Sequence, residues 1–122
     1  MNQLPIHNPA TGALITELPA DDAASVAAKS LQARAAQARW AAVPLAERKA
    51  CITRFRAAIV AELEPLAATM TRETGKPIKM SRNELNGLLG RIDFFLAETE
   101  GASATQTVFN EGGMTEQIEH TP

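Results

Sequence analysis

The chain is poor in aromatic residues and almost free of cysteine. Its 122 residues include four Phe, one Trp, no Tyr and a single Cys. The length suffices for one small domain and is too short for two substantial ones. Alanine supplies much of the apolar 45%, and it buries little area per side chain. We therefore expect a helical protein with a thin core that rests on a partner surface.

The single cysteine and the lack of long apolar runs indicate the cellular compartment. One cysteine, Cys51, excludes an internal disulfide and fits a reducing environment. Residues 1–6 contain no basic region followed by an apolar run, so no signal peptide is expected. No apolar stretch reaches the roughly 18 residues that a membrane span needs. The sequence predicts a soluble, cytoplasmic chain.

Neither sign of charge dominates the sequence. The net charge is −2, with acids and bases interspersed, which argues against nucleic-acid binding. Arg48, Lys49, Arg54 and Arg56 are close in sequence but point in different directions on a helix. A solvated helix face is predicted there in preference to a phosphate-binding stripe.

The first twenty residues have the pattern of a β-hairpin. Leu4–His7 and Leu14–Leu18 read as strands, and Leu14–Leu18 contains the branched residues that strands prefer. The intervening Asn8–Gly12 predicts a turn, in which Gly12 takes a positive φ. Pro5 and Pro19 limit the strands to short or edge pairing.

Three apolar helical stretches follow. The first runs from Ala23 to about Ala41, capped by Asp21 or Asp22, with a shallow alanine-rich stripe and Trp40 as an anchor. Because alanine is small, this helix should lie close against another surface. The apolar positions of the stripe are Val26, Leu31, Ala35 and Ala38.

Pro44 opens the second stretch, with Glu47 in its first turn. Its apolar residues recur every three or four positions, which predicts one buried face of a long helix. They are Ile52, Phe55, Ile59, Leu63, Leu66 and Met70. Pro65 removes a backbone hydrogen bond, so we expect a kink, or two helices that meet near Glu64.

Thr74–Pro77 predicts a helix end and a new beginning, because Gly75 suits the left-handed position and proline cannot continue a helix. The third stretch runs from Ile78 to about Glu98. Gly87 and Gly90 each weaken it by roughly 1 kcal/mol relative to alanine, a cost that a close neighbour would justify. Its predicted apolar face consists of Leu85, Leu88, Leu89, Ile92, Phe95 and Leu96.

After Gly101 the pattern changes to that of a second hairpin. Thr105–Phe109 and Thr115–Ile118 are predicted strands, and Asn110–Gly113 is the turn between them. The sequence reaches Pro122 directly after the second strand.

The residues that could carry chemistry do not form a recognisable site. Cys51 would need a nearby histidine or helix N-terminus to act as a nucleophile, and its mid-helix place favours packing. His7 and His120 are too few and too far apart in sequence for a metal site. No glycine-rich loop follows a strand and opens a helix. We predict no catalytic, cofactor-binding or metal-binding residue.

Serine and glutamate are two further residue types that can serve in catalysis. No serine lies in a strained strand-to-helix turn that would make it a nucleophile. The serines considered are Ser25, Ser30, Ser81 and Ser103. The helical carboxylates are expected on the surface. They are Glu62, Glu64, Glu73 and Glu84.

Four motifs in order resemble the start of the aldehyde dehydrogenase superfamily, and the match spans nearly the whole chain. Asn8–Gly12 followed by Leu14-Ile15 is similar to N-P-A-T-G-x-x-I. The alanine-rich helix that ends in Trp40 is the second motif. Pro44–Lys49 is similar to P-L-x-E-R-x. The most specific motif is Glu73–Pro77, with Glu84 further on.

The resemblance implies NAD(P)-dependent oxidation of an aldehyde to a carboxylic acid, through a thiohemiacetal on cysteine. In that family the helices pack on the outside of the dinucleotide-binding domain, and the second hairpin belongs to the oligomerisation arm. In relatives a proline such as Pro122 leads into a G-V-x strand and then W-N-[FY]-P, whose asparagine helps form the oxyanion hole. The catalytic cysteine, the general-base glutamate and the cofactor-holding lysine and glycines lie further on. The resemblance assigns Glu73, Gly75 and Lys76 a structural role.

The fold class expected is an α+β fragment of an α/β enzyme, with three or four helices flanked by two β-hairpins. Its parts are the N-terminal hairpin (1–20), a helical part that packs on the cofactor-binding domain (21–101) and the start of the oligomerisation arm (102–122). The expected partners are the remainder of such a chain and a second copy bound through 105–120, with no nucleic acid and no membrane. Alone, the segment is expected to bind no NAD or NADP and to be inactive.

The alternative interpretation is a stand-alone helical interaction module without enzymatic activity. The downstream coding sequence discriminates the two. Continuation into G-V-x and W-N-[FY]-P supports the enzyme, whereas a stop codon supports the module.

Overall fold

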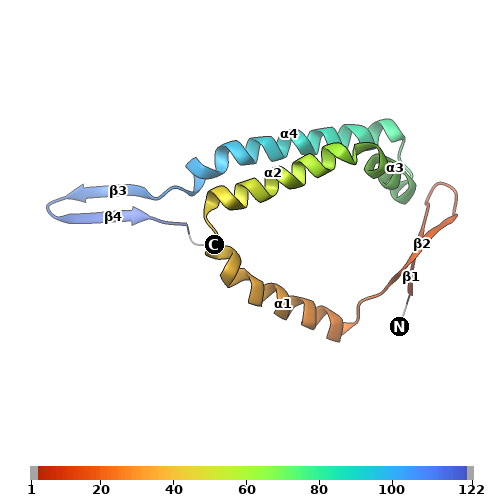
Figure 1. The fold of residues 1–122 in the computed structure, drawn as a ribbon, viewed down its shortest axis with the longest axis horizontal. Helices are drawn as coiled ribbons and strands as arrows, with labels where there is room; N and C mark the ends of the chain where they lie inside the picture. Colours follow the sequence, from red (N-terminus) through yellow and green to blue (C-terminus); the bar gives the residue numbers. More distant parts are fainter. Residues whose placement is uncertain (1–2, 121–122) are drawn as a thin grey trace.

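A computed structural model describes residues 3–120 as four helices flanked by two separate antiparallel hairpins. Figure 1 shows α2 and α4 side by side, α3 at one end of this pair, and α1 diverging from it. The β3–β4 hairpin projects beyond the far end of α4. The predicted combination of three or four helices and two hairpins is confirmed, with four helices in residues 3–120.

The first hairpin consists of β1 (Gln3–His7) and β2 (Leu14–Pro19), with Leu4 opposite Leu18. Its turn forms as predicted. The side chain of Asn8 accepts a hydrogen bond from the backbone of Ala10 at 2.9 Å, and Gly12 has a φ of +74°. Local turn chemistry therefore sets the geometry of this turn.

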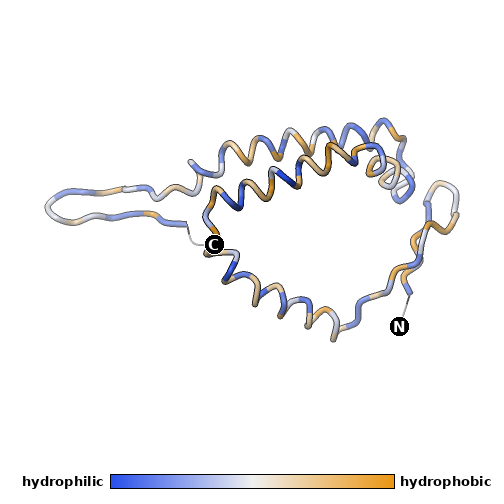
Figure 2. The backbone as a smooth tube through the Cα atoms, in the orientation of Figure 1, coloured by the Kyte–Doolittle hydropathy of each residue, from blue (hydrophilic) through white to orange (hydrophobic). Residues whose placement is uncertain are grey.

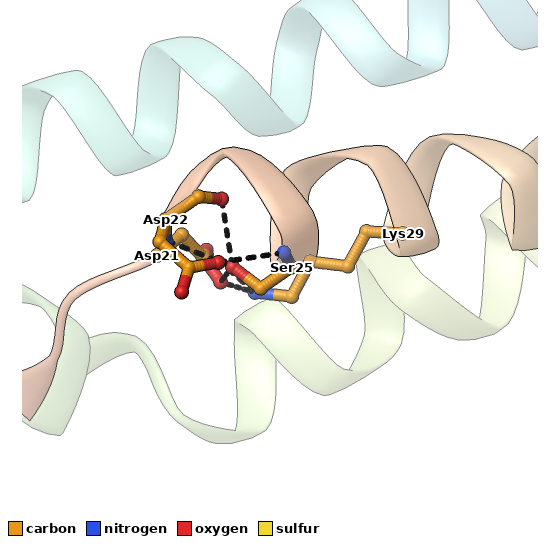
Figure 3. A network of polar contacts seen from close by, with 4 residues as sticks. All are labelled: Asp21, Asp22, Ser25 and Lys29. Carbon is orange, nitrogen blue, oxygen red and sulfur yellow. Dashed lines mark hydrogen bonds and ion pairs between the residues drawn. The ribbon is translucent and has the colours of Figure 1, made fainter. Parts of the chain in front are cut away.

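α1 (Ala23–Ala41) begins at Asp22, which is the capping residue of the two aspartates considered. Its carboxylate accepts from the backbone N–H of Ser25 at 2.8 Å, and the Ser25 hydroxyl accepts from the backbone N–H of Asp22 at 2.9 Å. The neighbouring Asp21 pairs with Lys29 at 2.6 Å (Figure 3). These contacts satisfy N–H groups that a helix N-terminus leaves free.

The alanine-rich face of α1 is not covered. No residue of α1 is buried, and Leu31 is 69% exposed. The expectation that this helix lies close against another surface is therefore not met among residues 3–120.

The second stretch divides into α2 (Leu45–Ala61) and α3 (Leu63–Thr74), which confirms the predicted break. The interruption falls at Glu62, two residues before the expected meeting point. Pro65 is the third residue of α3, where its missing N–H removes no helical hydrogen bond. The first bond of α3 joins the Leu66 N–H to the Glu62 carbonyl at 3.0 Å.

α4 (Ile78–Ser103) is five residues longer than predicted. In this last turn a side-chain hydroxyl bonds to the helix backbone: Ser103 donates to the Thr99 carbonyl at 2.6 Å. Gly87 and Gly90 lie inside the helix as expected. Apart from the adjoining backbone of α4 itself, no described atom lies within 4 Å of where their β-carbons would be. The close neighbour that would justify them is not among residues 3–120.

The core is small and lies where α2 and α3 pack on α4. Its buried residues are Ile59, Ala67, Ser81 and Leu85. The prediction of one buried face on the second stretch was wrong for several of its members, and members of the apolar face of α4 are exposed as well. They and their exposed fractions are Phe55 and Phe95 (56% each), Ile52 (41%), Leu66 and Leu88 (39% each).

The reason is physical: three or four contacting helices cover only the stripes that face one another. Figure 2 shows apolar segments along all the helices, including the isolated α1. Periodicity identified apolar faces, and the described chain has too few elements to cover them.

The second hairpin is β3 (Gln106–Glu111) and β4 (Met114–Ile118), with every strand residue exposed. Its turn is tighter than the predicted four residues, because Gly112 (φ +59°) and Gly113 (φ +80°) form a two-residue connection. The proline expected to lead into a further strand, Pro122, lies outside the described residues.

Candidate functional site

The two glycine-containing motifs meet in space. Gly75 ends α3 with a φ of +74°, which confirms its predicted role as a helix terminator. A β-carbon at position 75 would lie 3.0 Å from Pro9 Cγ and 3.5 Å from Ala10 Cβ. The tip of the first hairpin is thus docked on the α3–α4 turn, as Figure 1 also shows.

Polar contacts hold the α3–α4 turn in shape. Lys76 donates to both oxygens of Glu84 at 2.7 Å. The hydroxyls of Thr71 and the fully buried Ser81 lie 2.8 Å apart. Each of these four side chains therefore makes a contact within the fold.

Three ion pairs tie α4 to its neighbours, and two of them correct the picture of a purely solvated basic face. Arg56 binds Asp93 through two contacts at 2.6 and 2.7 Å, and Lys49 lies 3.4 Å from Glu100. Arg82 of α4 donates to both carboxylate oxygens of Glu64 on α3, through its Nε and Nη2 atoms. The packing of α2 on α4 turned part of the basic cluster toward acids that sequence spacing did not reveal.

These contacts shift the ionisation of the acids involved. Hydrogen bonds from Arg56 lower the pKa of Asp93, and those from Arg82 lower the pKa of Glu64. Both acids are therefore ionised at neutral pH and act as counter-ions within the fold. A catalytic acid would instead need a raised pKa.

Cys51 lies inside α2 and is half-buried, in agreement with the packing role predicted for it. It borders a shallow depression with Trp40, Val43 and Arg54. Neither histidine lines this depression, and Cys51 is remote from the N-terminal turn of its helix.

The remaining residues considered for chemistry are dispersed or used in the fold. His7 belongs to β1 and His120 follows β4, and residues 3–120 contain no cluster of three metal-ligating side chains. Ser25 caps a helix, Ser81 is buried against Thr71, and Ser103 bonds to its own helix. Ser30 is exposed on α1.

Within residues 3–120, one strand leads into a helix N-terminus, between β2 and α1, and a dinucleotide does not fit there. A pyrophosphate site there needs glycines and free backbone N–H groups. Asp21 and Asp22 occupy this position instead. Contacts with Lys29 lower the pKa of Asp21, and those with Ser25 lower the pKa of Asp22 (Figure 3). Two ionised carboxylates at this terminus would repel a phosphate.

An apolar groove of about 390 Å³ lies between α2 and α4. Trp40, at the end of α1, forms one wall, and its 41% exposure leaves it accessible. The other apolar lining residues are Leu45, Ile52, Ile92, Phe95 and Leu96. Because its walls come from three helices, periodicity within one helix could not have located it.

Arg48 also lines this groove, and sequence reasoning did not single it out from its basic neighbours. Its Nε atom is buried and has no hydrogen-bond partner within residues 3–120. Buried polar atoms are almost always satisfied in folded proteins. The groove is therefore mainly apolar, and Arg48 at its wall holds one buried donor that the described residues leave unsatisfied.

Among the helices of residues 3–120, none has the length and apolar character that crossing a membrane requires.

Comparisons with known proteins agree with the arrangement of motifs. The model of the aldehyde dehydrogenase family matches residues 1–122. N-succinylglutamate 5-semialdehyde dehydrogenase 1 of Caulobacter vibrioides is 39% identical over 85 residues, which are 70% of this chain and 18% of the relative. N-succinylglutamate 5-semialdehyde dehydrogenase of Novosphingobium aromaticivorans is 36% identical over 87 residues, 71% of this chain and 18% of the relative.

Solved structures show the same fold. An aldehyde dehydrogenase from Brucella melitensis biovar abortus 2308 superposes with a TM-score of 0.83 at 25% identity, covering 90% of this chain and 23% of that one. Succinate-semialdehyde dehydrogenase from Burkholderia pseudomallei gives a TM-score of 0.82 at 28% identity, with 90% and 23% covered. The chain thus spans about a fifth of the length of the relatives it matches.

Proposed function

The chain belongs to the aldehyde dehydrogenase family, and we propose that it supplies the N-terminal structural part of an NAD(P)-dependent enzyme that oxidises an aldehyde to a carboxylic acid. The observation that supports this most is the family match over the whole chain together with a fold match over 90% of it. The names of the relatives suggest a semialdehyde as substrate.

This segment's contribution is structural. NAD or NADP would accept the hydride in the complete enzyme. The residues described here do not fit that cofactor, because Asp21 and Asp22 occupy the turn between β2 and α1. Residues 1–20 and 21–101 are proposed to form the outer hairpin and helices against the cofactor-binding domain. Residues 102–122 are proposed to begin the oligomerisation arm.

The proposed partners follow from the exposed surfaces. The uncovered apolar faces of α1, α2 and α4 suit the remainder of an aldehyde dehydrogenase polypeptide. Residues 105–120 suit a second copy, because strands with unpaired edges accept another strand. A cytoplasmic location is consistent with the half-buried, unpaired Cys51.

A chimaera tests the proposal. The 122 residues replace the matching segment of the Caulobacter vibrioides relative, and NAD(P)H formation is followed at 340 nm with the semialdehyde substrate of that relative. We expect an active chimaera, no NAD(P)H from the 122-residue chain alone and none from the relative lacking this segment. A folded chimaera without activity would overturn the proposal. So would turnover by the chain alone that is lost on Cys51→Ser.

A further inference from the structure

We propose that Asn86 is a deamidation site, at which local opening of α4 lets the asparagine convert into aspartate and isoaspartate. Asn86 and Gly87 form the one Asn-Gly pair of the sequence. Both residues lie inside α4 and are exposed. The proposal concerns this helix alone and does not depend on the proposed function.

The reaction needs water and no enzyme. The backbone nitrogen of Gly87 attacks the side-chain carbonyl carbon of Asn86 and gives up its proton, a cyclic imide forms, and the side-chain amide leaves as ammonia. Water then opens the imide at either carbonyl. One product is aspartate, and the other is isoaspartate, whose main chain runs through the former side-chain carbon. Glycine favours the attack, because it has no side chain to hinder it and its backbone is the least restricted.

The intact helix prevents this attack, so opening must come first. The Asn86 Nδ2 atom donates to the Arg82 carbonyl at 2.9 Å, back toward the start of the helix and away from the Gly87 nitrogen. Rotation of the backbone at Asn86 breaks the helical hydrogen bonds that the N–H groups of residues 87–90 donate. These residues are therefore the segment that must open.

The segment 87–90 is a weak part of α4. It contains Gly87 and Gly90, and each glycine disfavours helix relative to alanine. Apart from the adjoining residues and backbone of α4, no described atom lies within 4 Å of where either β-carbon would be. Leu88 is exposed and Leu89 is half-buried, so opening removes little packed surface. A segment with few buried apolar contacts opens locally at low cost.

Asn83 is exposed in the same helix, but the corresponding opening costs more there. It breaks the helical bonds that the N–H groups of residues 84–87 donate. Within that segment Leu85 is 6% exposed in the core, and the Glu84 carboxylate accepts from Lys76 at 2.7 Å. The side chain of Glu84 also hinders attack by its own backbone nitrogen. Asn83 is therefore the internal control.

Isoaspartate at position 86 divides α4 into two parts, because its additional main-chain carbon does not fit the helical repeat. On the N-terminal side of this position, Arg82 binds Glu64 of α3. On the C-terminal side, Asp93 binds Arg56 of α2. The modification therefore separates the part of α4 that is attached to α3 from the part that is attached to α2.

The test follows the 122-residue chain during incubation at neutral pH and physiological temperature. Peptide mapping by mass spectrometry separates the asparagine, aspartate and isoaspartate forms at positions 83 and 86. A synthetic peptide of residues 80–92 gives the rate of the reaction without a stable helix. The variants are Gly90→Ala, which strengthens the helix and keeps the Asn-Gly pair, and Gly87→Ala, which removes the pair.

We expect Asn86 to convert in the chain, more slowly than in the peptide, while Asn83 stays intact. Gly90→Ala should slow this conversion about fivefold in the chain and leave the peptide rate unchanged, because it acts on the opening alone. Gly87→Ala should abolish the conversion. The isolated isoaspartate form should show less helical circular dichroism than Asn86→Asp, which has the new charge without the additional main-chain carbon.

Three results would overturn the proposal. Conversion at the same rate in chain and peptide would mean that α4 imposes no opening step. An intact Asn86 in the chain, under conditions that convert the peptide, would mean that the helix does not open there. Equal rates in Gly90→Ala and the unmodified chain would exclude residues 87–90 as the segment that opens. None of these results depends on the activity of the chimaera, so the proposed function is tested separately.

Discussion

The backbone of Gly75 lies so close to Pro9 that a β-carbon at position 75 would crowd the proline ring, at the point where the end of α3 meets the first hairpin. A β-carbon at position 75 would be 3.0 Å from Pro9 Cγ. The same residue has a φ of +74°, which side chains rarely adopt. Two independent constraints, one of conformation and one of space, therefore require glycine here.

We predict that Gly75→Ala lowers the free energy of unfolding by about 1–2 kcal/mol from its backbone conformation alone. The contact with Pro9 should add to this loss. Urea unfolding followed by circular dichroism measures both. The control is Gly87→Ala, in open space within α4, which should raise stability by up to about 1 kcal/mol. Equal effects of the two substitutions would contradict the prediction. The double variant Pro9→Ala/Gly75→Ala should recover only the part that the ring contributes.

Stability should fall with acid below the ordinary carboxylate range. The folded pKa values of Asp93 and Glu64 are lowered from 3.8 and 4.5 by their arginine partners. A lowered folded pKa contributes stability that is fully present above the unfolded value and is lost as the pH falls through the folded value. These two groups should therefore leave the thermal midpoint independent of pH near pH 7 and lower it below about pH 4.5.

The matched variant for this pH dependence is Asp93→Asn/Glu64→Gln. The thermal midpoint of this variant should be lower at pH 7 and should fall less steeply between pH 4.5 and pH 2. Because both pairs are solvent-exposed, 1 M NaCl should reduce the difference between variant and unmodified chain. A parallel decline in the two proteins would show that other groups control the acid response.

The thiol of Cys51 should react slowly. It is half-buried in α2, so a disulfide reagent at neutral pH should modify the folded chain more slowly than a free peptide thiol. Cys51→Ala should cost on the order of 1 kcal/mol, as the loss of a small packed side chain does. Labelling as fast as in urea would place the thiol on the surface.

The 122-residue chain alone is expected to self-associate. Val108 and Ile118 are 56% and 47% exposed on a hairpin with unpaired edges, and a two-stranded hairpin is marginal by itself. Light scattering coupled to size exclusion should show a mass that rises with concentration. Val108→Lys/Ile118→Lys should shift it toward the monomer. A single monomeric mass for the unmodified chain at all concentrations would argue that its surfaces need no partner.

Element boundaries were predictable from sequence wherever a single residue decides them. Asp22 caps α1, Pro44 precedes α2, and Gly75 ends α3, each through contacts within a few residues. The end of α4 was missed because Gly101 is compatible with helix and the nearby hydroxyls bond along it. Local contacts determined the boundaries at Asp22, Pro44 and Gly75. At the end of α4 they only favoured helix over other conformations.

Burial was not predictable in the same way. Ile59 and Phe55 belong to the same apolar series, yet one is 5% and the other 56% exposed. Periodicity shows that a face is apolar, but burial depends on whether another element lies over it. The groove that contains Arg48 was missed for the same reason, because its walls meet only after three helices are placed.

The ion pairs of the helical part are nested along the sequence, and this nesting bears on the order of folding. Glu64 and Arg82 are 18 residues apart, Arg56 and Asp93 are 37 apart, and Lys49 and Glu100 are 51 apart. Closing a longer loop costs more chain entropy, by roughly 0.6 kcal/mol for each doubling of length. Each pair that forms shortens the loop that the next must close. Helix α3 and the first turns of α4 should therefore assemble first, and α2 should join from its C-terminal end toward Lys49.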